Sequence, residues 1–181
     1  MLPGQTVVVQ GTGGVSIFAL QIARAAGANV IATSSSDAKL EIAKSLGADH
    51  TVNYSKRPRW SEAVREVTHG RGADHVIDVG GPSTIAESFR AIRFGGVINS
   101  IGALPTKGDV EEINAPVRAI QTQGILRGIL VGGRDVFNDL VRGIDKGKWH
   151  PVVDKVFDFA DTKSAFEYLK VRSFKSSLVD V

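Results

Sequence analysis

The most informative part of this chain of 181 residues is Thr6-Val7-Val8-Val9-Gln10-Gly11-Thr12-Gly13-Gly14-Val15-Ser16. Its β-branched first half has the continuous apolar character of a strand buried on both faces, as in a parallel sheet. Its glycine-rich second half leads into a helical period, in which apolar residues from Val15 to Ala26 share one face. Gly27 then fits the left-handed position that ends a helix. A strand, a glycine-rich turn and a helix in this order begin a βαβ unit.

The same alternation continues along the chain. Further strands are expected at 29–33, 49–54, 75–79, 96–102 and 125–131, and further helices at 37–46, 60–67, 84–92, 117–123 and 136–146. Thr84 and Glu87 have the spacing of a capping box. Strands that alternate with helices predict right-handed crossovers and a sheet covered on both faces. The predicted fold class is therefore α/β, a doubly wound parallel sheet of the Rossmann type in three layers, α-β-α.

The alternation of strands and helices changes near Trp149, which indicates that the chain has two parts. We expect residues 1–148 to form the Rossmann domain and residues 149–181 to form a strand–helix–strand extension packed on it. The two strands of the extension are expected to join the edge of the main sheet. A loop is expected at 104–109, where proline, glycine and polar residues gather.

Composition excludes several classes of protein. The chain has no cysteine, which rules out a disulfide scaffold, a thiolate metal site and a catalytic cysteine. The net charge is only +3 and no basic run is present, so no nucleic-acid partner is expected. No apolar stretch approaches the roughly 20 residues that span a bilayer, and no signal-peptide pattern is visible. We therefore expect a cytoplasmic protein with no membrane partner.

The glycine-rich turn carries the chemistry. Gly11 permits a tight turn, and Gly13 lets the backbone approach a pyrophosphate closely. The start of the following helix offers unpaired N–H groups and partial positive charge to an anion. Ser16 occupies the position of the third glycine of the dinucleotide fingerprint, and its small side chain still permits close packing. The turn is predicted to bind a nucleotide phosphate; the alternative is a purely structural turn.

The end of the second strand indicates which nucleotide is bound. A site for NAD places an acidic residue about 20 residues after the glycines, on the ribose hydroxyls. Here the sequence reads Thr33-Ser34-Ser35-Ser36, and the first acid is Asp37, with Lys39 beyond it. Hydroxyls and an ammonium suit a 2′-phosphate that a carboxylate would repel, so NADP is favoured and NAD is the less favoured cofactor. The alternative roles are a serine helix cap and a solvated Lys39.

Other chemistries lack their motifs. There is no P-loop, and neither tyrosine is followed four residues later by the lysine of short-chain reductases. The histidines have no metal-ligand spacing; they are His50, His69, His75 and His150. No catalytic residue and no metal ligand is assigned.

Several ordered segments resemble a known family. They are Pro3–Val9, Gly11–Val15, Ala19–Ala23, Leu46–Asp49, Val52–Tyr54, Gly72–Gly80, Phe94–Ile98 and Gly128–Gly132. Together they resemble the medium-chain dehydrogenase/reductase superfamily, in its zinc-type alcohol dehydrogenase and quinone oxidoreductase group. The resemblance covers essentially the whole chain.

This resemblance implies where a nicotinamide dinucleotide lies. Its pyrophosphate is expected over the glycine-rich turn, its 2′-phosphate at the end of the second strand, and its nicotinamide near the ends of later strands. The cofactor-binding residues are then Gly11, Thr12, Gly13, Gly14, Val15, Ser34, Ser35, Lys39, Tyr54, Gly80, Ile101, Gly102, Leu130, Val131 and Gly132. Family members often pair through the strand at 125–131, which makes a homodimer an expectation.

Full-length family members also carry an N-terminal domain that resembles GroES and holds the zinc ligands. We expect that domain to be absent here, so that the chain has no zinc and lacks catalytic residues of its own. It would be the NADP(H)-binding domain of an oxidoreductase acting on an alcohol or aldehyde, a quinone or an enone. The alternative is a stand-alone, non-catalytic NADPH-binding sensor or interaction module.

Overall fold

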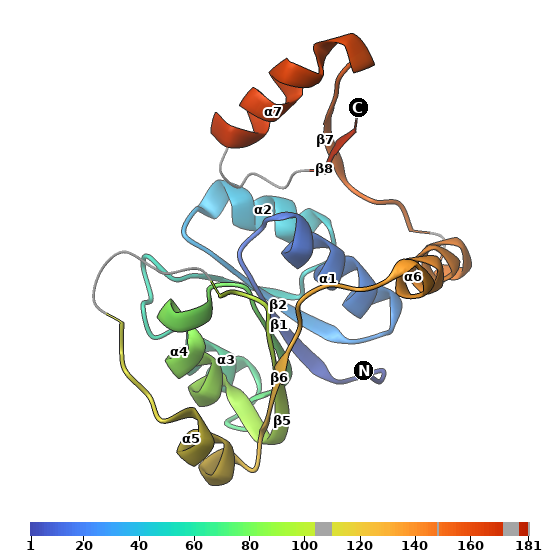
Figure 1. Cartoon of the computed structure of the whole chain (residues 1–181). Coiled ribbons are helices and arrows are strands. Elements are labelled where there is room, and N and C mark those ends of the chain that lie inside the picture. Colours follow the sequence, from blue (N-terminus) through green and yellow to red (C-terminus); the bar gives the residue numbers. More distant parts are fainter. Residues whose placement is uncertain (104–109, 148, 172–177, 181) are drawn as a thin grey trace.

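A parallel sheet of six strands is the centre of the computed structural model, which describes residues 1–103, 110–147, 149–171 and 178–180 (Figure 1). The strands are β1 (Thr6–Gln10), β2 (Asn29–Ser34), β3 (His50–Asn53), β4 (Ala73–Asp78), β5 (Ile92–Ser100) and β6 (Ile125–Gly128). Their order in the sheet is β3-β2-β1-β4-β5-β6, and neighbouring strands are parallel. This order confirms the predicted doubly wound sheet, with its switch point between β1 and β4. The loop expected at 104–109 lies outside the described residues.

Helices cover both faces of this sheet, which confirms the three layers. On one face lie α1 (Gly14–Ala25) and α2 (Asp37–Ser45), and on the other lie α3 (Trp60–Val67), α4 (Ile85–Ala91) and α5 (Ala115–Thr122) (Figure 1). Among the helices of the described ranges, none has both the length and the apolar character needed to cross a bilayer.

Strand β1 shows how the two cores form. Val7 and Val9 belong to the core cluster that contains Leu20 of α1, whereas Val8 belongs to the cluster that contains Val64 of α3. Successive strand residues point to opposite faces, so an unbroken valine run supplies both cores at once. Burying each of these side chains contributes about 1.5–3 kcal/mol.

Two predicted helix boundaries, the stop at Gly27 and the capping box at Thr84, have different outcomes in the structure. Gly27 follows α1 with φ +78°, the left-handed conformation expected of a helix stop. The capping box at Thr84 is wrong. The Thr84 hydroxyl donates to Asp78 Oδ1 at 2.8 Å, and the Glu87 carboxylate accepts from the backbone N of Ser61 at 3.0 Å. The Thr84 hydroxyl is thus drawn to a buried carboxylate, and the backbone N of Thr84, from which Glu87 would accept in a capping box, donates to Gly81 O at 3.0 Å.

An ion-pair network anchors the amino end of β4. Asp74 is buried and accepts hydrogen bonds at 2.6–2.9 Å from the side chains of Arg71 and Arg93 and from the backbone N of Thr6. Burial raises the pKa of Asp74, but these hydrogen bonds outweigh burial and hold the pKa well below its ordinary value. Asp74 therefore ties β1, β4 and β5 together at the end of the sheet opposite their carboxyl ends.

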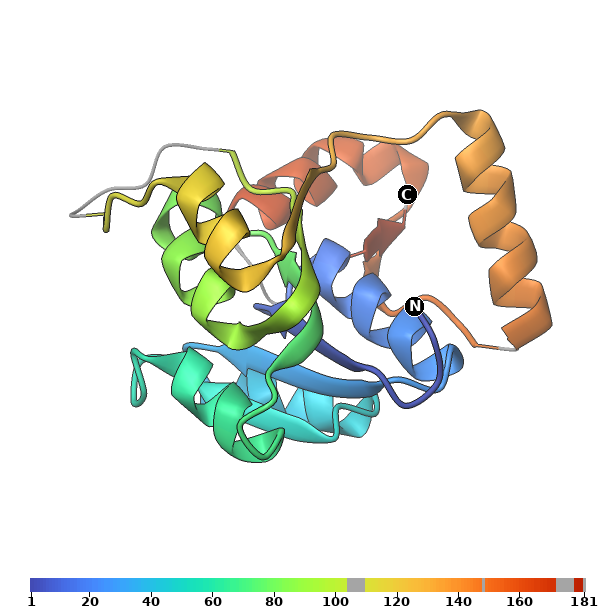
Figure 2. The same ribbon diagram turned by 90° about the horizontal axis from the view of Figure 1, so that it is seen from below.

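The predicted strand–helix–strand tail is present but pairs differently. Its elements are β7 (Val153–Val156), α7 (Thr162–Val171) and β8 (Leu178–Asp180). β7 and β8 pair with each other in a separate sheet, so their expected addition to the edge of the main sheet is wrong. Figure 2 shows the reason: α6 (Arg134–Gly147) carries the chain away from β6 before β7 begins. The two strands then satisfy each other's backbone groups.

Trp149 and His150, at the start of this tail, contact α1. The rings of Phe18 and Trp149 meet edge to face with their centroids 6.0 Å apart. The side-chain amide of Gln21 donates to the backbone oxygen of His150 at 2.7 Å. The tail is therefore anchored beside α1, on the face of the sheet that α1 and α2 cover.

Candidate nucleotide-binding site

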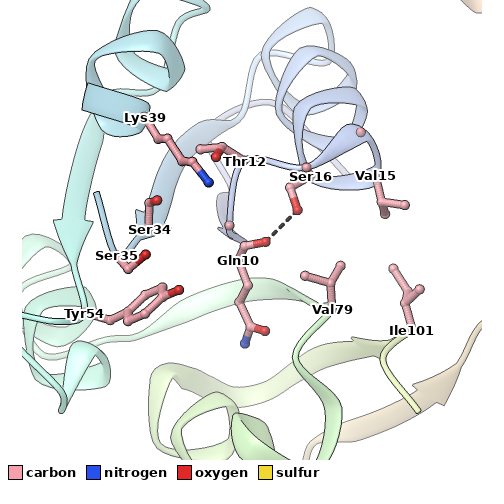
Figure 3. A pocket seen from close by; sticks show the side chains of 13 residues that line it. Gln10, Thr12, Val15, Ser16, Ser34, Ser35, Lys39, Tyr54, Val79 and Ile101 are labelled. Carbon is pink, nitrogen blue, oxygen red and sulfur yellow. Dashed lines mark hydrogen bonds between the residues drawn. The ribbon is translucent and has the colours of Figure 1, made fainter. Parts of the chain in front are cut away.

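A cavity of about 480 Å³ opens at the carboxyl ends of the strands, at the switch point between β1 and β4 (Figure 3). This is the place where doubly wound sheets bind their ligands. The residues that line it are Gln10, Gly11, Thr12, Gly13, Gly14, Val15, Ser16, Ser34, Ser35, Lys39, Tyr54, Val79 and Ile101. Most of the predicted cofactor residues thus come together around one cavity.

The glycine-rich turn forms one wall of the cavity. Gly11 has φ +76°, a conformation that side chains rarely adopt, and its backbone N donates to Thr33 O at 2.8 Å. Gly13 is the N-cap of α1 and no side chain caps the helix there. The first turn of α1, a helix of 12 residues, therefore presents its N-terminus to the cavity without a protein side chain as its cap. Such an end favours an anion.

Ser16 does more than leave room for close packing. Its hydroxyl is buried and donates to the backbone oxygen of Gln10 at 2.5 Å. This bond, drawn in Figure 3, ties the first turn of α1 to the last residue of β1. A glycine could not make this hydrogen bond, so the serine at the third position of the fingerprint stabilises the turn.

Polar groups gather at the β2 side of the cavity. Figure 3 shows the hydroxyls of Ser34, Ser35 and Tyr54 and the ammonium of Lys39 around the same space. Ser34 is only 3% exposed, while Ser35 is exposed. Ser36 is the residue at the N-cap of α2, but it makes no side-chain cap bond, so the alternative role of the serines as a helix cap is not found.

The first acidic residue after β2 is engaged elsewhere. Asp37 accepts from Lys56 Nζ at 2.6 Å and from Asn53 Nδ2 at 2.7 Å, and it does not line the cavity. The hydrogen bond from Lys56, followed by that from Asn53, lowers the pKa of Asp37. The lining residues therefore include one ammonium group, that of Lys39, and no carboxylate.

The opposite side of the cavity is apolar. Val15, Val79 and Ile101 project toward one another there from α1 and from the ends of β4 and β5 (Figure 3). Such a surface suits a flat, uncharged ring better than a phosphate. The cavity thus has a polar, cationic side and an apolar side, separated by the glycine-rich turn.

The remaining predicted residues lie outside this cavity. Gly80 lines an adjoining cavity of about 420 Å³, together with Trp60. Gly102 lines a separate cavity of about 390 Å³. Leu130, Val131 and Gly132 line neither the main cavity nor the adjoining one.

Sequence reasoning did not assign three of the lining residues to the cofactor. They are Gln10, Ser16 and Val79. Gln10 and Val79 each stand immediately before a glycine where a buried strand ends, and the carboxyl ends of parallel strands meet at one edge. This position at the end of a strand could have identified Gln10 and Val79 as residues that line the cavity. For metals, no three His, Cys, Asp or Glu side chains come together as a candidate site within the described part of the chain.

This sheet, with a glycine-rich turn at its switch point, defines a nucleotide-binding domain of the Rossmann type. The chain belongs to the zinc-binding dehydrogenase family, whose sequence model matches residues 14–146. The resemblance to the medium-chain dehydrogenase/reductase superfamily is thereby confirmed, and the match is to the C-terminal, cofactor-binding part of its members.

Individual relatives agree with this assignment. The chain is 48% identical over 167 residues to the zinc-type alcohol dehydrogenase-like protein C1773.06c of Schizosaccharomyces pombe, covering 92% of this chain and 48% of that protein. A structure from Sinorhizobium meliloti assigned as an alcohol dehydrogenase superposes with a TM-score of 0.85 at 37% identity, covering 99% of this chain and 52% of that one. An NAD-dependent alcohol dehydrogenase superposes with a TM-score of 0.82 at 34% identity, over 99% and 52%. The chain thus spans about half the length of these relatives.

Proposed function

We propose that this chain is the NADP(H)-binding domain of an oxidoreductase that transfers a hydride to or from an alcohol or aldehyde, a quinone or an enone. The observation that carries the proposal is the make-up of the cavity. An uncapped helix N-terminus faces it from one side, and two serines and a lysine face it from another, with no carboxylate among the lining residues. The chemistry of that set fits a dinucleotide that carries an additional phosphate.

Each phosphate has a matching part of the cavity. The pyrophosphate fits over Gly13 and Gly14, where the backbone has no Cβ and the helix end attracts an anion. The 2′-phosphate fits against Ser34, Ser35 and Lys39, because hydroxyls and an ammonium are good donors to phosphate oxygens. Both fits use only groups that line the one cavity.

The apolar side suits the nicotinamide. When bound, this ring supplies hydride transfer itself. Val15, Val79 and Ile101 would hold the ring and exclude water from it. Gly80 and Gly102 shape the neighbouring turns. The contact from Leu130–Gly132 stays a prediction of the family resemblance, since these residues lie away from the cavity.

The names of the relatives support the reaction class more than the cofactor. Relatives named alcohol dehydrogenases favour hydride exchange between an alcohol and a carbonyl compound. One similar structure is NAD-dependent, so the choice of nucleotide depends on local groups such as Ser34, Ser35 and Lys39 rather than on the fold.

A homodimer through residues 125–131 is part of the proposal. Within the described residues, β6 is an edge strand of the main sheet, with β5 as its one neighbour. The segment leaves large apolar side chains uncovered, with Leu130 90% and Val131 86% exposed. An unpaired edge next to exposed apolar residues is suited to pairing with a second copy of the chain.

We also propose that the chain divides into two parts and that it is cytoplasmic. The end of α6 at Gly147 and the separate β7–β8 sheet support a Rossmann domain at 1–148 and an extension at 149–181. The cytoplasmic location stays a prediction of the sequence.

Equilibrium binding tests this function. Isothermal titration of the chain with NADPH and with NADH is expected to give at least about tenfold tighter binding of NADPH, from one or two added charge-assisted hydrogen bonds. Equal affinities would refute the choice of nucleotide, and no binding of either would refute the function. A turnover assay on aldehydes, quinones and enones then separates an oxidoreductase domain active in this chain from a non-catalytic NADPH-binding module.

A further inference from the structure

A buried carboxylate lies beneath the candidate site. Asp78 is the last residue of β4, is fully buried, and lines neither the main cavity nor the adjoining one. Its Oδ1 accepts from the backbone N of Gly81 and the hydroxyl of Thr84, both at 2.8 Å. Its Oδ2 accepts from the hydroxyl of Ser88 at 2.6 Å and from Gln10 Nε2 at 3.3 Å. These four donors are uncharged, so the carboxylate is solvated by the protein itself.

Gln10 extends this network across the switch point. Its Nε2 donates to Ser88 Oγ at 2.8 Å as well as to Asp78 Oδ2. Its Oε1 accepts from the backbone N of Gly80 at 3.2 Å. Ser88 donates its only hydroxyl proton to Asp78 and accepts from Gln10, which fixes the direction of the Gln10 amide. The end of β1 is thereby joined to the turn that follows β4.

The backbone of Asp78 holds a third segment. Its carbonyl oxygen accepts from the backbone N of Ile101 at 2.8 Å and from that of Gly102 at 3.1 Å. One residue therefore reaches the end of β1, the turn after β4 and the turn after β5. Gln10 and Ile101 line the main cavity, and Gly80 lines the adjoining one.

The turns that follow β4 and β5 pack closely against each other. Gly81 has φ +62°, and a Cβ placed on it would lie 2.7 Å from the backbone carbon of Gly102. The two turns are thus pressed together with no side chain between them. Hydrogen bonds of Gln10 and Asp78 link these turns to the end of β1.

We propose that Asp78 is a positioning residue, which presets the walls of the cavity around the nicotinamide side of the dinucleotide without touching it. This inference rests on the proposed function of the cavity. A site whose walls are held in advance does not have to order them on binding, so the network raises affinity. The β2 end, with Ser34 and Lys39, lies outside the network of Asp78 and Gln10, so binding of the 2′-phosphate depends on it less.

The variant Asp78→Asn tests the polarity of the network at constant size. An amide NH₂ in place of Oδ2 would face two existing donors, Gln10 Nε2 and the Ser88 hydroxyl. Turning the Gln10 amide to avoid this conflict would place its NH₂ against the backbone N of Gly80. Either way a buried donor loses its acceptor, and the wall moves. Ser88→Ala is a milder second variant, which removes only the bridging hydroxyl.

The matched control is Asp74→Asn on the same strand. Asp74 is also a buried carboxylate of β4, but it lies at the amino end of the strand, away from the cavity. It is expected to lower stability while leaving nucleotide affinity unchanged. Circular dichroism at the temperature of the titrations verifies that each variant is folded.

The readout is affinity for NADPH compared with affinity for 2′-AMP, which carries only the adenosine 2′-phosphate half. Asp78→Asn is expected to weaken NADPH at least about tenfold and 2′-AMP less than about threefold, and Ser88→Ala to weaken NADPH about threefold. Should Asp78→Asn not fold, Ser88→Ala decides by the same comparison. The inference is overturned if the folded variants bind NADPH as the wild type does, if both ligands weaken equally, or if Asp74→Asn has the same effect. A wild-type chain that binds no NADPH would refute the proposed function instead.

Discussion

Replacing Ser34 by aspartate puts a negative charge where the 2′-phosphate of NADPH is proposed to bind. Ser34 is 3% exposed and faces the cavity beside Ser35 and Lys39. In the wild type no carboxylate lines this space, since Asp37 is held by Lys56 and Asn53. The substitution therefore adds the kind of group that a site for NAD carries at this position.

The size of the effect follows from Coulomb's law. Two unit charges about 5 Å apart repel by about 3 kcal/mol at an effective dielectric constant of about 20, and by less than about 1 kcal/mol in bulk water. The cavity opens to solvent, so a penalty of about 1–3 kcal/mol is expected for the carboxylate of Ser34→Asp against the phosphate. NADPH should then bind about 5- to 150-fold more weakly. NADH has no 2′-phosphate, and its ribose hydroxyls can donate to the new carboxylate, so its affinity should stay the same or rise.

Isothermal titration of both nucleotides measures this change. Ser34→Asn is the matched control, since it has nearly the size of aspartate without the charge, and its preference should remain with NADPH. An unchanged ratio of NADPH to NADH affinity in Ser34→Asp would refute the placement of the 2′-phosphate. An equal loss in both variants would show that size, rather than charge, is responsible.

Three other changes have expected outcomes. Asp74→Asn should lower the free energy of unfolding by about 2–4 kcal/mol, since it leaves two arginines without their buried partner, one of them half exposed. Because the pKa of Asp74 is depressed in the folded state, this stabilisation is complete above about pH 4 and fades as the pH falls further. Urea unfolding curves of the wild type and the variant should therefore converge in acid. Ser16→Ala removes the bond between α1 and β1 and should cost about 1 kcal/mol and weaken NADPH a few-fold, whereas unchanged denaturation and titration curves would contradict the role of Ser16. Leu130→Glu should make the chain monomeric in analytical ultracentrifugation, and a wild type already monomeric would contradict the dimer.

Local sequence signals predicted most of the fold. The valine run of β1 and the stop at Gly27 depend on neighbours only a few residues away, and each is found where expected. The apolar face predicted for α1 from Val15 to Ala26 is wrong, since Val15 and Ile22 are exposed. Packing on the sheet selects another face, whose buried residues are Ser16, Ile17, Leu20 and Ala23. The glycine-rich turn could likewise be placed at the switch point, because parallel strands meet at their carboxyl ends.

Long-range contacts decided what the sequence did not reveal. The Thr84 hydroxyl bonds to Asp78 instead of capping its own helix, because the fold brings a buried carboxylate beside it. Gln10 bonds to partners 68 and 78 residues away, a relation that no local pattern encodes. Similarly, β7 pairs with β8, which brings Val153 opposite Leu178, a long-range contact that no local pattern encodes.

A crystal structure of the chain with bound NADPH shows directly whether the cavity between the glycine-rich turn and the end of β2 binds the nucleotide by its phosphates. The 2′-phosphate is predicted within hydrogen-bond distance of Ser34, Ser35 and Lys39, with the pyrophosphate over Gly13 and Gly14. A nucleotide bound elsewhere, or bound here with its 2′-phosphate turned away from Ser34 and Lys39, would contradict this prediction.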